Sequence, residues 1–262
     1  RTIARFADPA NAGIHMEGPY IAAEDGPRGA HPREYVRAAS VDDFRRRQEA
    51  AEGRIVLVTL APEVAGALGL IEYLVGQGIR VAIGHTAATP AQIRDAVRAG
   101  ATMSTHLGNG CANVLPRHPN FIWEQLAADE LYAGFIVDGH HLPPATVKAM
   151  VRAKTPARSF LVTDAIAAAG CSPGRYRIGS MEVELSENGR VAAAGASHLA
   201  GSALTLDRAV CNTVRFTGLP LYSVLPMAST IPAAAMGMQP AGRVVGEWDP
   251  KMQTLRIETV ET

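Results

Sequence analysis

The chain has 262 residues, 25 basic and 25 acidic side chains, three cysteines and a formal net charge of zero. This balanced charge excludes the basic excess of a nucleic-acid-binding protein, and no apolar run approaches the roughly 18–20 residues of a membrane span. Three cysteines are too few and odd in number for a disulfide framework, so we expect a reducing, cytoplasmic compartment. Together with the balanced charge and the lack of a long apolar run, this predicts an α/β protein with neither nucleic-acid nor membrane partners.

Short apolar segments alternate with helix signals along much of the chain. Segments rich in Val, Ile, Leu or Thr predict buried strands over 12–17, 55–60, 79–85, 102–106, 132–138 and 159–164. Helix starts are predicted at Ser40, Pro62, Thr89-Pro90 and Pro144. The second of these helices is expected to bury Val64, Leu68, Ile71 and Val75. This alternation predicts a parallel sheet covered by helices on both faces.

After Asp164 the pattern of alternating strands and helices changes. Residues 175–185, with Asn188-Gly189, predict a hairpin, because Asn-Gly favours a tight turn between strands. Residues 244–260 predict a further strand-rich tail.

Polar residues stand at the ends of the predicted strands. They are Glu17, His85, His106, Asp138 with His140 and His141, and Asp164. The carboxyl ends of parallel strands lie on one face of a sheet or barrel, and ligands bind at that face. We therefore expect these side chains to converge, although they are far apart in the sequence.

Each polar residue alone has a simpler explanation, such as a hydrogen-bonded core histidine or, for Asp164, a helix cap. Together, their burial costs stability unless they are paired or coordinated. Glu17, His85 and His106 would give a site of two imidazoles and one carboxylate, which suits Zn or Fe with a position left for water. Asp164 would then transfer the proton of that water. His15, on the same strand face as Glu17, suits an outer position around the metal.

The segments HMEGPYI, TLAPE, GHTAAT, THLGNG, VDGHH, LVTDAIAAAG and LAGSALTLD, in this order, resemble the motifs of the N-acetylglucosamine-6-phosphate deacetylase family of the amidohydrolase superfamily. The resemblance implies a distorted (β/α)₈ TIM-like barrel over 1–240 that lacks its first strands. It also implies that 241–262 are the remnant of a small β domain formed by both chain ends. The usual early PGFIDxHxHG segment and the usual PGxxADLVVLD tail do not occur in the sequence.

The resemblance also implies an activity: hydrolysis of the acetamide of N-acetylglucosamine 6-phosphate to glucosamine 6-phosphate and acetate by a metal-dependent homodimer. Glu17, His85 and His106 match the metal ligands, and Asp164 matches the catalytic aspartate. His31 matches the histidine that contacts the substrate amide and stabilises the oxyanion. The other positions that match substrate-binding residues are Asn109, Gly110, the phosphate-binding Arg117, His141, Leu199, Ala200 and Gly201.

The sequence departs from the family pattern around His106, where THLGNG replaces THLFNA and an REPG-like turn is missing. The altered pocket floor leaves open another N-acyl amine, a cyclic amide or an aminopurine as substrate. Arg117 also has the simpler interpretation of a surface arginine, and His140 suits a helix N-terminus better than a substrate contact. A sugar-phosphate-binding protein without turnover is the remaining alternative, but binding alone needs no general base such as Asp164.

Overall fold

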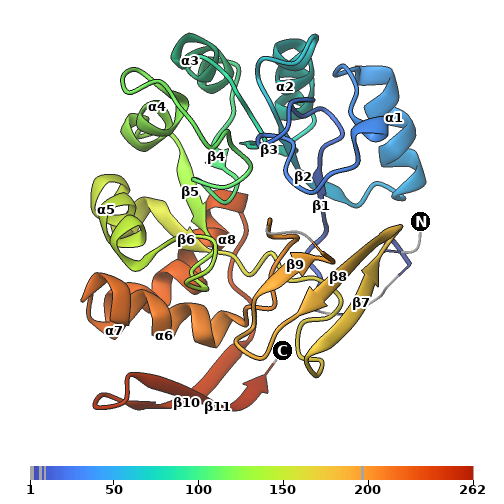
Figure 1. Ribbon diagram of the computed structural model, residues 1–262. Coiled ribbons are helices and arrows are strands. Elements are labelled where there is room, and N and C mark those ends of the chain that lie inside the picture. The colour runs from blue at the N-terminus through green and yellow to red at the C-terminus, as the bar shows by residue number, and fades with distance from the viewer. Residues whose placement is uncertain (1–2, 6–7, 9, 196–197, 262) are drawn as a thin grey trace. The chain divides into compact units, whose positions relative to one another are not determined.

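Six strands form one sheet in which chain order and spatial order coincide (Figure 1). The pairs from β1 to β5 are parallel. The strands are β1 (Ile14–Glu17), β2 (Ile55–Leu60), β3 (Arg80–Ile83), β4 (Met103–Ser104), β5 (Tyr132–Phe135) and β6 (Ser159–Leu161). All six predicted strands are present, and the α/β class is confirmed.

The computed structural model describes residues 3–5, 8, 10–195 and 198–261. The chain divides into two compact units, 1–133 with 235–237, and 134–234 with 238–261. The boundary falls inside β5, whose first two residues pair with Met103 and Ser104 of β4. The predicted division at 240/241 and the closure of the sheet into a barrel stay predictions.

The helices are α1 (Val41–Ala50), α2 (Ala67–Gly76), α3 (Pro90–Arg98), α4 (Phe121–Ala127), α5 (Pro144–Lys154), α6 (Leu206–Thr217), α7 (Leu221–Val224) and α8 (Thr230–Met236), with short 3-10 segments at Arg33–Tyr35, Pro156–Arg158 and Leu225–Ala228. The four predicted helices, α1, α2, α3 and α5, lie in the expected places between the strands, whereas the sequence analysis did not predict α4 or the helices α6 to α8 that follow Asp164. In the first unit, α1 to α4 lie in chain order on the outer side of the strands (Figure 1). None of the helices in the described part of the chain is long and apolar enough to cross a bilayer.

Capping residues explain where the predicted helices begin. The Ser40 side chain accepts a hydrogen bond from the backbone of Asp43 at the start of α1. Thr89 and Gln92 form a capping box at the start of α3, which fixes two otherwise unpaired donors. Asn120 caps α4, a helix that sequence reasoning did not predict.

The expected start of α2 was wrong, and of its expected buried residues Ile71 is buried whereas Leu68 and Val75 are not. The helix begins at Ala67 and not at Pro62, because Gly66 adopts a left-handed backbone (φ 82°) close to the carbonyl of Ala39. As a result Leu68 and Val75 are 39% and 41% exposed. The residues that α2 buries are Ala67, Leu70, Ile71 and Leu74.

The core of the first unit holds the start of the loop that follows Glu17. Phe44 of α1, Leu60 of β2 and Ile83 of β3 belong to one buried hydrophobic cluster with Tyr20. The hydroxyl of Tyr20 donates to Asp43 at 2.8 Å. The chain is thereby anchored three residues after Glu17, which restricts where that carboxylate lies.

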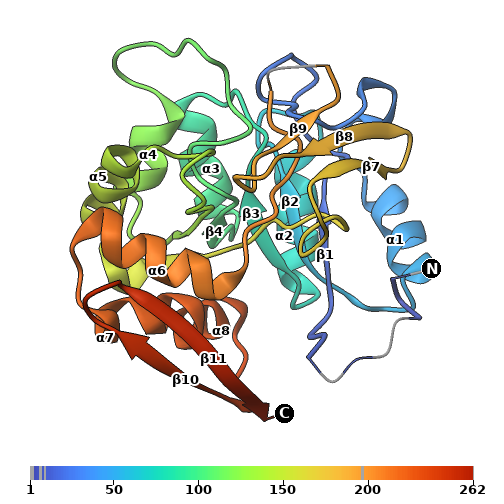
Figure 2. The same ribbon diagram turned by 60° about the horizontal axis from the view of Figure 1, so that its bottom comes forward.

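Antiparallel strands follow β6 in the second unit (Figure 2). They are β7 (Gly174–Ile178), β8 (Met181–Leu185), β9 (Val191–Ala193), β10 (Arg243–Asp249) and β11 (Thr254–Glu261). The predicted hairpin is formed by β7 and β8, whereas Asn188-Gly189 lies in the turn between β8 and β9. The β10–β11 hairpin matches the predicted strand-rich tail and lies against α6, where the backbone N–H of Leu255 is 3.2 Å from the Cys211 sulfur.

Candidate active site

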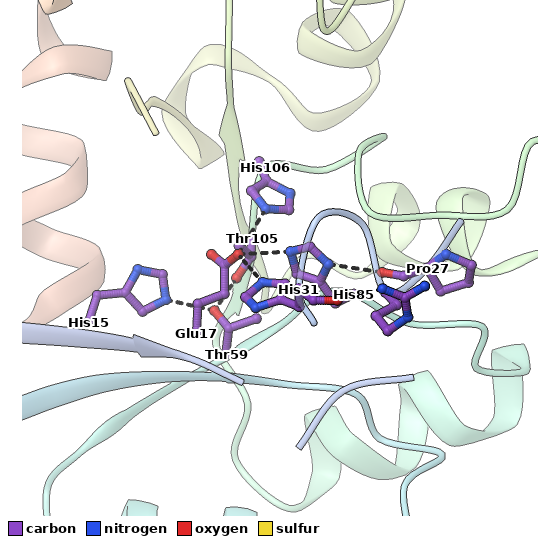
Figure 3. A network of polar contacts seen from close by, with 9 residues as sticks. His15, Glu17, Pro27, His31, Thr59, His85, Thr105 and His106 are labelled. Carbon is purple, nitrogen blue, oxygen red and sulfur yellow. Dashed lines mark hydrogen bonds and ion pairs between the residues drawn. The ribbon is translucent and has the colours of Figure 1, made fainter. Parts of the chain in front are cut away.

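Three imidazoles surround one oxygen of Glu17 in the first unit (Figure 3). The Oε1 atom of Glu17 lies 2.8 Å from Nε2 of His85, 3.1 Å from Nε2 of His31 and 3.6 Å from Nε2 of His106. The His85 ring lies edge-on to both others, with ring centroids 4.6 Å from His31 and 4.9 Å from His106. The predicted convergence of Glu17, His85 and His106 is therefore observed, and His31 joins them from the loop after β1.

The two strand-end histidines have strained backbones. His85 follows β3 with φ 51°, and His106 follows β4 with φ 25°, both in the left-handed region that residues other than glycine rarely adopt. Both residues are only 5% exposed. Strain of this kind persists only where surrounding contacts enforce it, and it is enriched at functional sites.

The donor set of the cluster fits a divalent metal ion. Nδ1 of His85 lies 2.9 Å from the Pro27 carbonyl, which can only accept, so Nδ1 carries the proton. The lone pair of Nε2 then faces the Glu17 carboxylate at 2.8 Å, and two acceptors at that distance need a cation between them. Burial lowers the pKa of His85, against the effect of Glu17, so a proton is disfavoured. An outer hydrogen bond from Nδ1 to a carbonyl is also typical of metal-binding histidines.

The electrostatics of Glu17 agree with a metal-ligand role. Burial alone would raise the pKa of Glu17, but hydrogen bonds with the neighbouring imidazoles, those of His106 and His31 foremost, outweigh burial and hold this pKa far below its ordinary value. Glu17 is therefore a carboxylate at every physiological pH. A group of Glu17, His31 and His85 has one ligand atom each within 4.8 Å of one another, and this group is the geometric candidate for holding a metal.

His15 lies outside this cluster, in a chain of hydrogen bonds through two threonines. Its Nε2 is 2.7 Å from the Thr59 hydroxyl, which is 2.6 Å from the Thr105 hydroxyl (Figure 3). Gly84 packs against both threonines, and a Cβ there would lie 2.7 Å from Thr105. Sequence reasoning did not identify these threonines, which link His15 on β1 to β2 and to the residue directly after β4.

The loop after His106 contains three predicted substrate-binding residues. The backbone N–H of Asn109 donates to the His106 carbonyl at 3.0 Å, and the Asn109 side chain reaches the same carbonyl at 3.3 Å. Gly110 packs on His85, where a Cβ would lie 2.8 Å from Nδ1. The usual alanine would therefore crowd His85 in this backbone. Arg117 is exposed.

The second unit contains the other predicted site residues. Asp164 follows β6 with φ 49°, and its carbonyl accepts from the Ser202 backbone at 3.1 Å. Leu199, Ala200 and Gly201 directly precede Ser202, so this predicted loop lies beside Asp164.

The predicted substrate contact His141 is paired with a carboxylate. Its Nδ1 lies 2.7 Å from Asp138 Oδ2, and the backbone N–H groups of His140 and His141 donate to Oδ1 of the same residue. Burial raises the pKa of Asp138, but these bonds outweigh it and the pKa lies below its ordinary value. The sequence analysis places Asp138 at the end of a strand but assigns it no role.

Sequence and structure comparisons give a consistent set of relatives, although no protein-family model matches the chain. The chain is 34% identical over 227 residues to an N-acetylglucosamine-6-phosphate deacetylase from Vibrio furnissii, covering 87% of this chain and 56% of the relative. It is 36% identical over 226 residues to an N-acetylgalactosamine-6-phosphate deacetylase from Escherichia coli O157:H7, covering 86% of this chain and 59% of the relative.

A solved structure of N-acetyl-D-glucosamine-6-phosphate deacetylase from Mycobacterium smegmatis superposes with a TM-score of 0.86 at 34% identity, covering 95% of this chain and 67% of that one. A variant of the same protein, in complex with N-acetyl-D-glucosamine-6-phosphate, gives a TM-score of 0.86 at 33% identity, with 95% and 66% covered. The chain thus spans less than two thirds of the length of the curated relatives described above.

Proposed function

The chain belongs to the N-acetylglucosamine-6-phosphate deacetylase family, and on this premise we propose that its protein hydrolyses the acetamide of N-acetylglucosamine 6-phosphate. The products are acetate and glucosamine 6-phosphate. The observation that carries this function is the convergence of three imidazole nitrogens on one oxygen of Glu17. A protein that only binds a sugar phosphate has no use for such a cluster.

Glu17, His85 and His106 are the proposed ligands of one divalent metal ion, Zn or Fe. When bound, such a metal lowers the pKa of a coordinated water and polarises the acetyl carbonyl. His31 donates a hydrogen bond to the oxyanion that forms on the amide. This role is supported by its place beside Glu17 and His85, with Nε2 directed at the cluster. A preorganised donor of this kind stabilises the transition state by roughly 3–4 kcal/mol.

Asp164 is the proposed proton-transfer group. Its carboxylate takes the proton of the attacking water and then delivers that proton to the departing amine. This role is supported by its position after β6, the last strand of the sheet, and by its left-handed backbone. His85 and His106 have the same two features, after β3 and β4.

The remaining predicted residues are proposed to bind the sugar phosphate. Arg117 and His141 contact the phosphate and the sugar, Asn109 and Gly110 line the pocket after His106, and Leu199, Ala200 and Gly201 form a further wall. Asp138 holds the His141 ring in one orientation at 2.7 Å, which suits a residue that must present Nε2 to a ligand.

The proposed architecture of the whole protein is a distorted (β/α)₈ barrel, with 1–240 contributing most of it and 241–262 belonging to a small β domain. The β10–β11 hairpin is compatible with such a domain. The proposed assembly is a homodimer in which Arg117 reaches the neighbouring subunit's pocket. Its exposed position agrees with a contact outside its own subunit.

The epimer N-acetylgalactosamine 6-phosphate is a second candidate substrate. The Escherichia coli relative named for that sugar phosphate is 36% identical to this chain, and the Vibrio furnissii relative named for N-acetylglucosamine 6-phosphate is 34% identical. The sequence also departs from the usual pattern at Gly110, next to His85. The two candidate substrates differ only in the orientation of one sugar hydroxyl, whereas the amide chemistry is common to both.

The function is tested by measuring amine release from purified full-length protein loaded with Zn²⁺. We expect turnover of N-acetylglucosamine 6-phosphate to exceed that of unphosphorylated N-acetylglucosamine, with N-acetylgalactosamine 6-phosphate compared in parallel. Faster turnover of the galactose epimer would assign the second substrate. Absence of amine release from every N-acetylated sugar phosphate, by protein that contains stoichiometric metal, would contradict a deacetylase.

The Arg117→Ala variant tests phosphate recognition. A guanidinium bonded to phosphate is worth about 1.5–3 kcal/mol, so we expect kcat/KM for the phosphorylated sugar to fall about 10–100-fold, and kcat/KM for the unphosphorylated sugar to stay unchanged. Arg117→Lys keeps the charge but not the bidentate geometry, so its kcat/KM for the phosphorylated sugar should lie between those of the wild type and Arg117→Ala. Equal losses for both sugars would place Arg117 outside the phosphate site.

The same variant tests the dimer. Mixed dimers of Arg117→Ala with Asp164→Asn contain one complete pocket if Arg117 crosses to the neighbouring subunit, and none if it does not. Recovered activity in verified heterodimers would support the crossing.

A further inference from the structure

Backbone hydrogen bonds hold the chain at Gly84 and His85, directly after β3. Gly84 donates to the carbonyl of Leu60 at 3.2 Å, and the carbonyl of His85 accepts from Ala22 at 2.9 Å. The left-handed backbone of His85, with φ 51°, turns the chain sharply at the same residue. The direction of the His85 imidazole therefore also depends on the contacts that hold residues 86–88, which follow it in the chain.

A single carboxylate holds those residues. Oε2 of Glu63 accepts from the Thr86 hydroxyl at 2.5 Å, and Oε1 of Glu63 accepts from the Ala87 backbone at 2.6 Å. The Thr86 hydroxyl also accepts from the Ala88 backbone at 3.0 Å, and Thr86 is only 2% exposed. Hydrogen bonds to an ionised acceptor are roughly twice as strong as neutral ones. Both oxygens of Glu63 thus bind the chain directly after His85.

The position of the His85 ring leaves little tolerance for movement of this loop. Its Nδ1 is 2.9 Å from the Pro27 carbonyl, and its Nε2 is 2.8 Å from Glu17. Gly110 and Gly29 also pack against the ring. A Cβ added at Gly110 would lie 2.8 Å from a ring atom of His85, and one added at Gly29 would lie 3.0 Å from another ring atom. A shift of the backbone at Thr86 moves the ring against all of these contacts at once.

We propose that Glu63, at the end of the TLAPE segment between β2 and α2, is a positioning residue for the metal centre. It holds Thr86 and Ala87 and thereby aims the His85 imidazole at Glu17. Glu63 acts through His85 and is neither a ligand nor a proton donor. This inference rests on the proposed metal-dependent function, because it assigns His85 as a ligand.

The test is the Zn²⁺ affinity of the metal-free full-length protein, measured by competition with a chromophoric chelator. Loss of an outer contact of a metal ligand typically costs 10–100-fold in metal affinity. We expect a weakening of that size for Glu63→Gln, which replaces one acceptor oxygen by a donor, and for Thr86→Val, which removes the hydroxyl at nearly constant shape. The visible absorption band of bound Co²⁺ should also shift in both variants.

Two matched variants serve as controls. Thr86→Ser keeps the hydroxyl and should restore wild-type affinity, and Glu72→Gln changes an exposed carboxylate on α2 and should have no effect. Because Glu63 and Thr86 share one bond, the double variant should lose less affinity than the product of the two single losses.

Wild-type Zn²⁺ affinity in folded Glu63→Gln and Thr86→Val would overturn the inference, even if urea unfolding showed both to be less stable. If Glu63→Gln does not fold, the pair Thr86→Val and Thr86→Ser decides. Failure of the wild-type protein to bind Zn²⁺ would overturn the proposed metal-dependent function itself, whereas normal wild-type binding with unaffected variants would overturn only the role of Glu63.

Discussion

Asp164→Asn in the full-length protein is expected to lower kcat by about 10²–10⁴, the usual contribution of a general acid–base group. Asparagine nearly preserves the shape of the side chain but cannot take the proton of the attacking water or return it to the amine. Substrate binding and metal content should stay close to wild type, because Asp164 is not one of the proposed ligands. The loss therefore belongs to kcat and not to KM.

The control for this variant is Asp129→Asn, which changes an exposed carboxylate outside the site. It should leave kcat, KM and metal content unchanged. The pH–rate profile of Asp164→Asn provides an independent readout, since a titrating general base contributes one limb of that profile. Near-normal turnover by Asp164→Asn with metal in place would rule out proton transfer by this residue and leave Asp164 as a structural residue after β6.

The six strands were predictable because parallel strands buried on both faces are short continuous apolar runs. Their ends were less predictable: β3 stops at Ile83 and β4 at Ser104, two residues before His85 and His106. The reason is local. Both histidines turn into the left-handed region, and a residue there leaves the strand. An apolar pattern does not report such a turn.

The convergence of Glu17, His85 and His106 followed from topology, because their strands β1, β3 and β4 are parallel in a single sheet. The position of His31 required the structure. His31 lies in an irregular loop, where no periodicity relates sequence distance to spatial distance. The contacts of Glu63 with Thr86 and Ala87 are of the same kind, since each joins two loops through a side chain.

His106→Ala is expected to abolish stoichiometric metal binding, with a loss of Zn²⁺ affinity beyond the 10–100-fold typical of outer contacts. The matched variant is His31→Ala, because His31 lies closer to Glu17 than His106 does, with Nε2 3.1 Å against 3.6 Å from Oε1. If His31 stabilises the oxyanion and is not a ligand, His31→Ala keeps the metal but loses kcat by about 10²–10³.

Elemental analysis and Zn²⁺ titration of both variants separate the two possible ligand sets. Metal retained in His106→Ala and lost in His31→Ala would replace the proposed ligands by Glu17, His31 and His85, the group that the geometry brings within 4.8 Å. Loss in both variants would make all three histidines ligands. A metal bound by three imidazoles and Glu17 would have four protein ligands, and such a closed shell is typical of a structural zinc site and not of a catalytic one. If the metal is Zn²⁺, the proposed hydrolysis is therefore best served by a ligand set that leaves out His31.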